Sequence, residues 1–500
     1  MNIPEEVQFT LKKLEDAGFE AFIVGGCVRD FIMGRIPNDW DITTNAKPEE
    51  IQEIFPDSLY ENQYGMVTVR IGEDKETRFE IQVTTYRVES GYSDQRHPDG
   101  VQFVKTIEED LARRDFTVNA LALERIDLSS LKATTRHSTN AERILTNHES
   151  SLIDLFGGQE DIENKVIRAV GDAGERFEED ALRMMRAVRF ATQFDFEIEE
   201  KTAEAIKNNS QSLGKVSQER IRDELVKIIL SDHPSKGIEM LQKLGLLRSI
   251  LPEVEYGIGV GQNRHHTYTI YQHLILSLKH CPSKKLTVRL ASLFHDIAKP
   301  QTKHGDGFNS TFYNHDYVGS KIVKKILKRL RFSNEIIDRV SLLVKNHMFF
   351  YNVDEVSDAG VRRIVKRIGA ENVKDLIDLR IADRLGSGVP KAKPYKLRHF
   401  EFMIDKVSKD PISTKMIKIN GNEIMKLLDI KPGPKVGCIM DALLSEVLDD
   451  PSRNTKEYLE NRAKEISELN LNEIRKLAKE KIEERKEEEE QVLKRRHYVQ

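Results

Sequence analysis

The sequence predicts an α+β protein, with a small mixed sheet at its N-terminal end and largely α-helical domains after it. Short apolar runs separated by turn residues indicate strands in the N-terminal part, at 19–24, 39–43, 67–71, 78–85 and 101–104. From Phe177 onward the apolar residues recur at the spacing typical of helices. A chain of 500 residues is too long for one hydrophobic core, so we expect several domains.

Composition restricts the class of protein without identifying a partner. The 32% charged and 39% hydrophobic residues are typical of a highly charged, helix-rich globular protein. With 82 acidic against 78 basic residues the net charge is −4, so a nucleic-acid surface would have to be local. Cys27, Cys281 and Cys438 lie too far apart for a disulfide framework or a zinc-finger spacing. The N-terminus lacks a signal peptide's apolar core, and no apolar run approaches the roughly 20 residues of a membrane span. These features predict a cytoplasmic protein with no membrane partner.

A glycine pair follows the first predicted strand. Gly25 and Gly26 come directly after the apolar run 19–24, and residues 28–33 suit a short helix. Glycine lets a backbone approach a ligand closely, and the amides at a helix N-terminus attract anions. The order of strand, glycine pair and helix therefore predicts a phosphate site. A dinucleotide fold is disfavoured because no Gly-x-Gly-x-x-Gly follows the strand.

Two aspartates begin the second predicted strand. Asp39 and Asp41 are alternate residues, so their carboxylates should point to the same face. Parallel carboxylates repel each other unless a cation lies between them, and oxygen ligands favour Mg²⁺. Alone, a glycine pair is usually a turn and Asp-x-Asp is often a solvated strand edge. In this order they predict nucleotidyl transfer, which needs a phosphate site beside a metal-binding carboxylate pair.

Together these motifs resemble the class II tRNA nucleotidyltransferases, the CCA-adding enzymes, of the polymerase-β superfamily. The resemblance extends from about Phe19 to Leu230 in five ordered motifs and continues more loosely through an HD-type domain and a C-terminal domain. It implies a polymerase-β-like head that adds C, C and A to the 3′ end of tRNA from CTP and ATP. The implied domains are a nucleotidyltransferase head at 1–172, a helical neck for base selection and RNA binding at 173–255, an HD domain at 262–390 and a helical tail at 395–500.

The resemblance also implies roles for individual residues. Asp39 and Asp41 would be catalytic and hold Mg²⁺. The nucleotide-binding set is Gly25, Gly26 and Arg29 for the triphosphate, Arg114, Asp115 and Asn119 for the ribose, and Asp180, Arg183 and Arg186 in the neck. Asp94 and Arg96 match the flexible loop that family members need for the final A, which favours complete CCA addition.

One position departs from the family pattern. The family usually has Glu-x-Thr-Thr-x-Arg in the last strand before the flexible loop, whereas Gln82 stands at the Glu position here. Glu80, two residues earlier, is expected on the same strand face. Either Glu80 substitutes as a third carboxylate, or the third carboxylate is not essential.

Base choice can be derived from donors and acceptors. Asp180 and Arg183 are three residues apart on a predicted helix, so they should share a face. A carboxylate only accepts hydrogen bonds and a guanidinium only donates them. Cytosine and adenine both present an amino donor beside a ring-nitrogen acceptor, whereas guanine and uracil present the reverse order. The pair therefore predicts acceptance of C and A. Without the other motifs we would interpret it as a weak surface ion pair.

Histidines and aspartates gather in the region 262–390. His295 and Asp296 follow the apolar run 290–294, and further candidates lie on predicted helices around them. The pattern resembles the HD phosphohydrolase superfamily, which implies as metal ligands His273, His295, Asp296 and Asp383, with His315 and His347 completing a second metal position. His266 is an alternative first ligand. Imidazole ligands favour Ni, Mn, Zn or Fe over Mg. The sequence leaves open whether such a metal supports phosphoester hydrolysis or only ties the helices together.

Two alternative functions remain at this stage. One is an A-adding enzyme or poly(A) polymerase of the same superfamily, which incorporation of CTP would distinguish. The other is chiefly an HD phosphohydrolase with a degenerate head, although the intact pair Asp39 and Asp41 argues against degeneracy.

Overall fold

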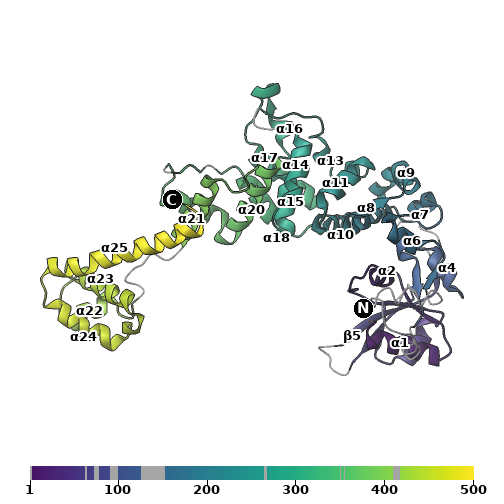
Figure 1. Cartoon of the computed structure of the whole chain (residues 1–500), viewed down its shortest axis with the longest axis horizontal. Coiled ribbons are helices and arrows are strands. Elements are labelled where there is room, and N and C mark those ends of the chain that lie inside the picture. The colour runs from purple at the N-terminus through teal and green to yellow at the C-terminus, as the bar shows by residue number, and fades with distance from the viewer. Residues whose placement is uncertain are drawn as a thin grey trace, which may run out of the picture. The chain divides into compact units, whose positions relative to one another are not determined.

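The chain forms two compact units in the computed structural model (Figure 1). One comprises residues 1–345 and 385–388, and the other comprises 346–384 and 389–500. The structure describes residues 3–61, 65–72, 78–90, 100–125, 152–263, 267–349, 351–353, 355–408 and 417–499. The polar segment 127–151, which is rich in Ser and Thr, falls outside these residues. The two units do not coincide with the domain limits expected from the sequence, and those limits stay a prediction.

The first unit contains a mixed sheet, which confirms the predicted α+β class. Its seven strands, in spatial order, are β3 (Ser58–Glu61), β4 (Met66–Ile71), β5 (Phe79–Thr85), β2 (Asp41–Thr44), β1 (Ala21–Val24), β8 (Leu121–Leu123) and β9 (Leu152–Asp154). β2 runs parallel to β5, and the other neighbouring pairs are antiparallel. A separate antiparallel ribbon consists of β6 (Arg87–Ser90) and β7 (Gly100–Phe103).

The register of the sheet places the N-terminal motifs next to one another. β1 lies between β2 and β8, with Ile23 opposite both Ile42 and Leu123. Ile23 and Ile42 are fully buried, as expected for short apolar strands at the centre of a sheet. The end of β1, from which the glycine pair leads, therefore lies beside the start of β2, which carries Asp41.

The strand predicted at 39–43 begins two residues later than predicted. β2 begins at Asp41, and Asp39 lies in a bend ahead of it. The reason is turn chemistry, because Pro37 and Asn38 favour a bend over an extended run. Asp39 and Asp41 are therefore not alternate residues of one strand as predicted.

Helices complete the N-terminal part of the first unit. Those around the sheet are α1 (Glu5–Asp16), α2 (Gly26–Ile32), α3 (Pro48–Ile54), α4 (Ile107–Ala112), η1 (Thr117–Asn119) and α6 (Gly158–Glu163). The following ones are α7 (Ala173–Glu179), α8 (Leu182–Phe194), α9 (Glu200–Asn209), η3 (Ser210–Lys215), α10 (Gln218–Leu230), α11 (Pro234–Lys243), α12 (Leu247–Ile250) and α13 (Pro252–Glu255). The short strands β10 (Val166–Ile167) and β11 (Glu197–Ile198) pair in parallel among them.

The histidine-rich region is helical, as predicted. Its elements are α14 (Ile270–Lys279), α15 (Leu286–Phe294), α16 (Lys299–Thr302), β12 (Lys303–His304), η4 (Gly307–Asn309), β13 (Thr311–Phe312), α17 (His315–Arg329) and α18 (Asn334–Asn346). The apolar run 290–294 forms the end of α15 and is buried, so the two residues after it, His295 and Asp296, enter the interior.

Among the described residues of the second unit, all the regular elements are helices. It contains α19 (Asp358–Ile368), η5 (Ala370–Asn372), most of α20 (Val373–Gly386), α21 (Tyr395–Ser408), α22 (Gly421–Leu428), α23 (Pro434–Asp449), η7 (Pro451–Arg453), α24 (Lys456–Ser467) and α25 (Leu471–Arg496). Ile424, Leu443, Leu459 and Ile474 are fully buried at the centre of its C-terminal helices. Within the described part of the chain, we find no helix with the length and apolarity needed to cross a membrane.

Candidate functional site

The glycine pair makes a sharp turn between β1 and α2. Gly25 has φ +82°, a backbone conformation that side-chain-bearing residues rarely adopt. A Cβ atom at Gly25 would lie 2.7 Å from Nη1 of Arg114, which is closer than two such atoms can approach. The backbone N–H of Gly25 donates to the carbonyl of Leu121 at 3.0 Å. The structure thus confirms the predicted order of strand, glycine pair and helix, and it adds Arg114 beside the turn.

The two aspartates influence each other electrostatically. Burial raises the pKa of Asp41, the Arg114 guanidinium opposes this rise, and the charge of Asp39 adds to it. Asp39 is exposed and Asp41 is half-buried. A cation beside both carboxylates would relieve the repulsion and offset the burial, and an oxygen-only donor set suits Mg²⁺. The residues therefore fit the magnesium site that the sequence predicts, even though Asp39 lies outside the strand.

Four residues of the predicted nucleotide-binding set form one hydrogen-bonded chain. Arg29 donates through Nη1 to Oδ1 of Asn119, and Asn119 Nδ2 donates to Oδ1 of Asp115 at 3.1 Å. Arg186 Nε donates to the other oxygen of Asp115 at 2.6 Å. Burial alone would raise the pKa of Asp115, but Arg186 and Asn119 lower it to about 2. Asp115 is therefore an ionised, fixed acceptor that joins the head to α8.

Two aromatic rings on α8 contact Arg29, the first residue of this series of hydrogen bonds. The Arg29 guanidinium lies 4.4 Å from the ring centroid of Phe194 and 5.3 Å from that of Phe190. A guanidinium over an aromatic face is attracted by the ring's negative face. Phe190 and Phe194 were not predicted from the sequence, because phenylalanines on a helix usually indicate only a core.

Arg114 is held in place by a buried carboxylate. Its Nη2 lies 3.3 Å from Oδ2 of Asp110, whose other oxygen is 2.8 Å from Nη2 of Arg113. Burial raises the pKa of Asp110, and the two arginines lower it by more, so the net shift is downward. Arg114 is thereby held beside both the glycine turn and Asp41.

Asp180 and Arg183, predicted to select the base from one helix, do not lie on the same helix, so that part of the prediction is wrong. α7 ends at Glu179 and α8 begins at Leu182, which leaves Asp180 in extended backbone between them. The short carboxylate there accepts the backbone N–H of Leu182 at 3.0 Å. This local bond competes with helical bonding and explains the break.

Asp180 and Arg183 are each held by another charged residue. Arg220, on α10, contacts both oxygens of Asp180, at 3.2 and 2.7 Å. Arg183 Nη1 donates to Oε2 of Glu179 at 2.6 Å. The surface ion pair between Asp180 and Arg183 is therefore not formed. Arg220 was missed by the sequence analysis, and no local signal singles it out, because it lies 40 residues from Asp180.

The sheet register bears on the missing third carboxylate. Gln82 lies directly opposite Asp41 in the parallel pair of β2 and β5, and its side chain is on the exposed face. Glu80 precedes Gln82 by two residues on β5. It lies opposite Arg70 of β4 and forms an ion pair with it at 3.0 Å. Glu80 is about 6.6 Å from the Gln82 position at the usual rise of a strand. This arrangement favours the interpretation that the third carboxylate is not essential here.

Replacing Glu80 by glutamine should therefore lower the initial rate of CTP incorporation less than about threefold. Its exposed pair with Arg70 contributes roughly 0–1 kcal/mol, so the melting temperature should also change little. Replacing Gln82 by alanine is the matched comparison at the position opposite Asp41 and should slow the reaction more. A loss of about 100-fold in the Glu80→Gln protein would show instead that Glu80 acts as the third carboxylate.

A second cluster of polar residues lies in the histidine-rich region. His273 on α14, His295 after α15 and Asp296 are buried, and their ligand atoms lie close enough together to share one metal ion. The Nε2 atoms of the two histidines are 2.9 Å apart, and each lies within 3.3 Å of Oδ2 of Asp296. Two nitrogen atoms at this distance require a proton or a cation between them.

Hydrogen bonds to backbone carbonyls orient the rings of His295 and His315 so that their Nε2 lone pairs face Asp296. His295 Nδ1 is 3.0 Å from the carbonyl of Ser292, and His315 Nδ1 is 2.6 Å from that of Phe312. A carbonyl only accepts, so Nδ1 carries the proton and Nε2 is left as the ligand atom. Nε2 of His315 lies 3.3 Å from Oδ1 of Asp296. The donor set therefore fits a transition metal.

Lys299 contributes a positive charge to the same cluster. Its Nζ is 2.6 Å from Oδ2 of Asp296 and 2.7 Å from Oε1 of Gln262. Burial would raise the pKa of Asp296, but the Lys299 ammonium lowers it well below its usual range. Asp296 is therefore ionised, as a metal ligand must be.

The remaining predicted residues belong to the second unit or lie outside the described residues. His347 and Asp383 belong to the second unit, where Asp383 pairs with Arg380 at 2.6 Å, and their part in the metal site stays a prediction. Asp94 and Arg96 of the flexible loop, and the alternative ligand His266, lie outside the described residues.

Models of three protein families match successive parts of the chain. The Poly A polymerase head domain matches residues 21–168, the probable RNA and SrmB-binding site of polymerase A matches 195–258, and the HD domain matches 263–387. The first contains the glycine turn and the carboxylate pair, and the third contains the histidine cluster.

Solved structures show a similar fold. The crystal structure of the Bacillus stearothermophilus CCA-adding enzyme in complex with CTP matches with a TM-score of 0.56 and 23% identity, over 93% of this chain and 98% of that one. The Thermotoga maritima CCA-adding enzyme complexed with tRNA-CCA matches with a TM-score of 0.51 and 20% identity, over 93% and 96%.

Curated relatives match over nearly their whole length. The CCA-adding enzyme of Pediococcus pentosaceus is 35% identical over 452 residues, which cover 90% of this chain and 95% of that enzyme. That of Lactococcus lactis subsp. cremoris is 33% identical over 471 residues, covering 93% and 98%. Because this similarity spans the head, the RNA-binding region and the HD domain, the chain belongs to the family of CCA-adding enzymes, which are tRNA nucleotidyltransferases.

Proposed function

We propose that this chain completes the 3′ end of tRNA by adding C, C and A from CTP and ATP, with Asp39 and Asp41 as its catalytic residues. The observation that carries the proposal is the position of the two carboxylates beside the Gly25 turn and Arg114. Asp39 and Asp41 would hold two Mg²⁺ ions. When bound, such ions promote deprotonation of the attacking 3′-hydroxyl and stabilise the leaving pyrophosphate.

The other head residues position the nucleotide. Backbone amides at Gly25 and Gly26 would contact the triphosphate, together with Arg29, whose side chain is already fixed by Asn119 and by the α8 rings. Asp115 and Asn119 would accept and donate hydrogen bonds at the ribose. These hydrogen bonds fix the side chains of Arg29 and Asp115, and groups that are already fixed need little reorganisation at the moment of reaction.

Asp180 and Arg183 would select the base, and Arg186 would belong to the same nucleotide-binding region. Asp180 offers acceptors to the amino group of C or A, and Arg183 offers donors to the neighbouring ring nitrogen. In the structure Asp180 pairs with Arg220, and Arg183 pairs with Glu179. A bound base would therefore either displace these partners or hydrogen-bond beside them. Arg220 would then keep Asp180 ionised and oriented while the base binds.

Incubation of the purified protein with a tRNA transcript lacking CCA, with each nucleoside triphosphate singly and then with CTP and ATP together, tests the proposal. Sequencing of the products should show two C residues with CTP alone and CCA with both nucleotides. Addition of A alone, without incorporation of CTP, would favour an A-adding enzyme or a poly(A) polymerase.

The three free cysteines fit a protein that works in the reducing cytoplasm.

The HD domain supports a second, metal-dependent activity. Ligands His273, His295 and Asp296, joined by Asp383, would hold Ni, Mn, Zn or Fe, with His315 and His347 at a second position. Such a metal would supply Lewis-acid activation of water, which is the chemistry that phosphoester hydrolysis needs. The supporting observation is the buried cluster whose imidazole lone pairs are directed to Asp296.

Replacing Asp296 by alanine should remove the transition metal and any phosphatase or cyclic phosphodiesterase activity, while CTP and ATP incorporation stays nearly unchanged. Elemental analysis and a model phosphoester assay measure the two effects. Asp306→Ala, at an exposed position of the same region, is the matched control. A metal that is retained without Asp296-dependent turnover would mean that the site is structural. Absence of both metal and turnover in the unaltered protein would exclude the hydrolase.

A further inference from the structure

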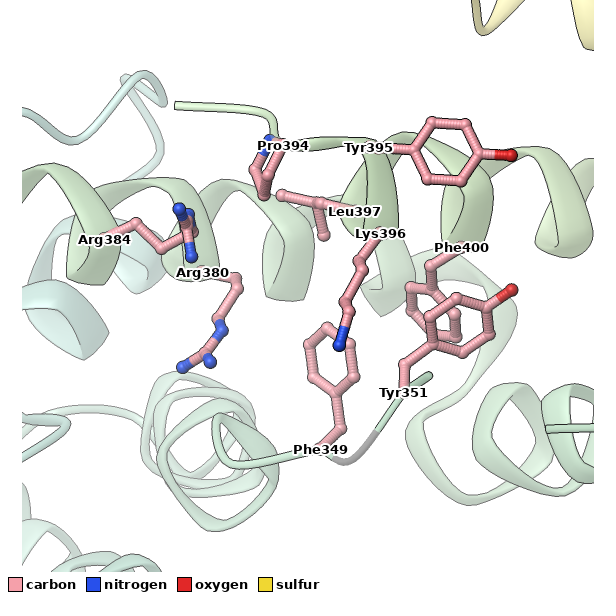
Figure 2. Close-up of a pocket in the computed structure, with 9 residues that line it drawn as sticks. All are labelled: Phe349, Tyr351, Arg380, Arg384, Pro394, Tyr395, Lys396, Leu397 and Phe400. Atoms are coloured by element: carbon pink, nitrogen blue, oxygen red, sulfur yellow. The ribbon is translucent and has the colours of Figure 1, made fainter. Parts of the chain in front are cut away.

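A pocket of about 360 Å³ opens in the second unit, beside the start of α21 (Figure 2). Its volume falls within the roughly 300–1,000 Å³ of small-molecule sites. The lining comes from the segment after α18, from α20 and from the N-terminal turn of α21. No residue of the head, and none of the predicted HD ligands, is part of this lining. The pocket is therefore a different site from the two described above.

One side of the pocket is aromatic. Phe349 and Tyr351 each lie with their ring centroids 4.8 Å from that of Phe400, which is buried. Tyr395, on the first turn of α21, keeps 39% of its surface exposed. Figure 2 shows the rings of Tyr351 and Phe400 toward one end of the pocket, with Phe349 nearer its middle. Flat rings fixed by their neighbours are suited to stacking against another aromatic group.

The other end of the pocket is positively charged. Figure 2 places the guanidinium groups of Arg380 and Arg384 there. Arg380 pairs with Asp383 at 2.6 Å, whereas no ion pair to Arg384 is found among the described residues of this unit. The Nε of Arg384 is buried without a hydrogen-bond partner. Lys396 donates to the neutral side chain of Asn352 at 2.6 Å, which leaves its charge uncompensated by that bond.

These two ends together define the ligand. We propose that the pocket binds one nucleotide, with its base against Phe349, Tyr351 and Tyr395 and its phosphate at Arg384 and Arg380. A guanidinium binds phosphate through paired charge-assisted hydrogen bonds, and aromatic side chains stack on any base. A purely apolar ligand would leave the buried Arg384 Nε without a partner, which is costly. The nucleotide is either free or part of an RNA strand, since both present the same base and phosphate.

Photolabelling of the full-length protein locates such a site directly. The probe is 8-azidoadenosine 5′-monophosphate, applied with excess CTP so that the head is occupied. We expect label on peptides that contain Phe349 and Tyr351 or Tyr395. The nucleoside 8-azidoadenosine, which lacks the phosphate, should label these peptides about tenfold less, because a charge-assisted pair contributes roughly one decade of affinity. Label confined to peptides of the head would overturn the proposal.

Substitutions test the charged end. Arg384→Gln should reduce labelling of these peptides about tenfold, by the loss of one charge-assisted contact. Lys396→Gln should also reduce the labelling of these peptides. The Lys396 side chain is exposed, so its replacement does not disturb the core. Arg363→Gln, on the exposed face of α19, is the matched control and should label as the unaltered protein does. Unchanged labelling in both pocket variants would overturn the proposal.

Competition separates the two sources of the nucleotide. If a single-stranded RNA oligonucleotide displaces the probe at lower concentration than AMP does, the pocket holds a nucleotide of an RNA strand. If AMP displaces it and the oligonucleotide does not, the pocket holds a free nucleotide. Displacement by neither would contradict nucleotide binding. This test does not depend on nucleotide addition or on HD hydrolysis, so its failure leaves both of those proposals standing.

Discussion

Replacing Asp41 by asparagine should reduce CTP and ATP incorporation about a thousandfold or more. Loss of a carboxylate that holds the catalytic metal removes several kcal/mol of transition-state stabilisation, and about 1.4 kcal/mol corresponds to a factor of ten. Asp39→Ala should have an effect of similar size. Initial rates on a tRNA transcript lacking CCA measure the loss. Asp16→Ala, at an exposed aspartate that ends α1, is the control for removing a negative charge from the head.

The same substitution has a stability signature that does not depend on activity. Because burial and Asp39 raise the pKa of Asp41 in the folded state, ionisation of Asp41 opposes folding at pH values above that pKa. Asp41→Asn should therefore melt no lower than the unaltered protein at pH 7 without metal, and the difference should disappear below the ordinary aspartate pKa. Added Mg²⁺ should raise the melting temperature of the unaltered protein but not of Asp41→Asn.

Retention of more than a few per cent of the nucleotide-incorporation activity in both the Asp39 and Asp41 variants would contradict the catalytic assignment.

Replacing Arg183 by alanine should abolish most of the discrimination between nucleotides. A site that hydrogen-bonds its substrate can reject an analogue with the wrong donors by about a thousandfold or more. Without the guanidinium donors, the kcat/KM values for UTP and GTP should approach those for CTP and ATP, while the latter two also fall. Single-nucleotide incorporation assays with all four triphosphates give the four values.

The structure supplies a strict control for this experiment. Glu179 pairs with both Arg183 and Arg176, in each case at 2.6 Å. Arg176→Ala therefore disturbs the same carboxylate without removing the predicted base-contacting group, and it should leave the order of preference intact. If Arg183→Ala slows all four nucleotides by one common factor, Arg183 is structural and the donor–acceptor argument is wrong.

Features that depend on a few neighbouring residues could be predicted from the sequence. The glycine turn after β1 and the placement of His295 and Asp296 after α15 follow from apolar runs and backbone freedom, which act over less than ten residues. The α+β class follows for the same reason. Local reasoning failed at Asp39 and at Asp180, where a bend and a side-chain bond to the backbone overrode the expected strand and helix.

The residue types along the chain specify which chemical groups this protein has available: a glycine turn, a carboxylate pair, arginines and a set of histidines with an aspartate. Which of these groups meet depends on the tertiary structure. Arg29 and Asn119 are 90 residues apart, and Asp115 and Arg186 are 71 apart, yet each pair is hydrogen-bonded. Likewise, Arg220 rather than Arg183 binds Asp180. Periodicity and turn chemistry describe a segment's own conformation, whereas these bonds depend on how the head packs against α8 and α10, which no local pattern encodes.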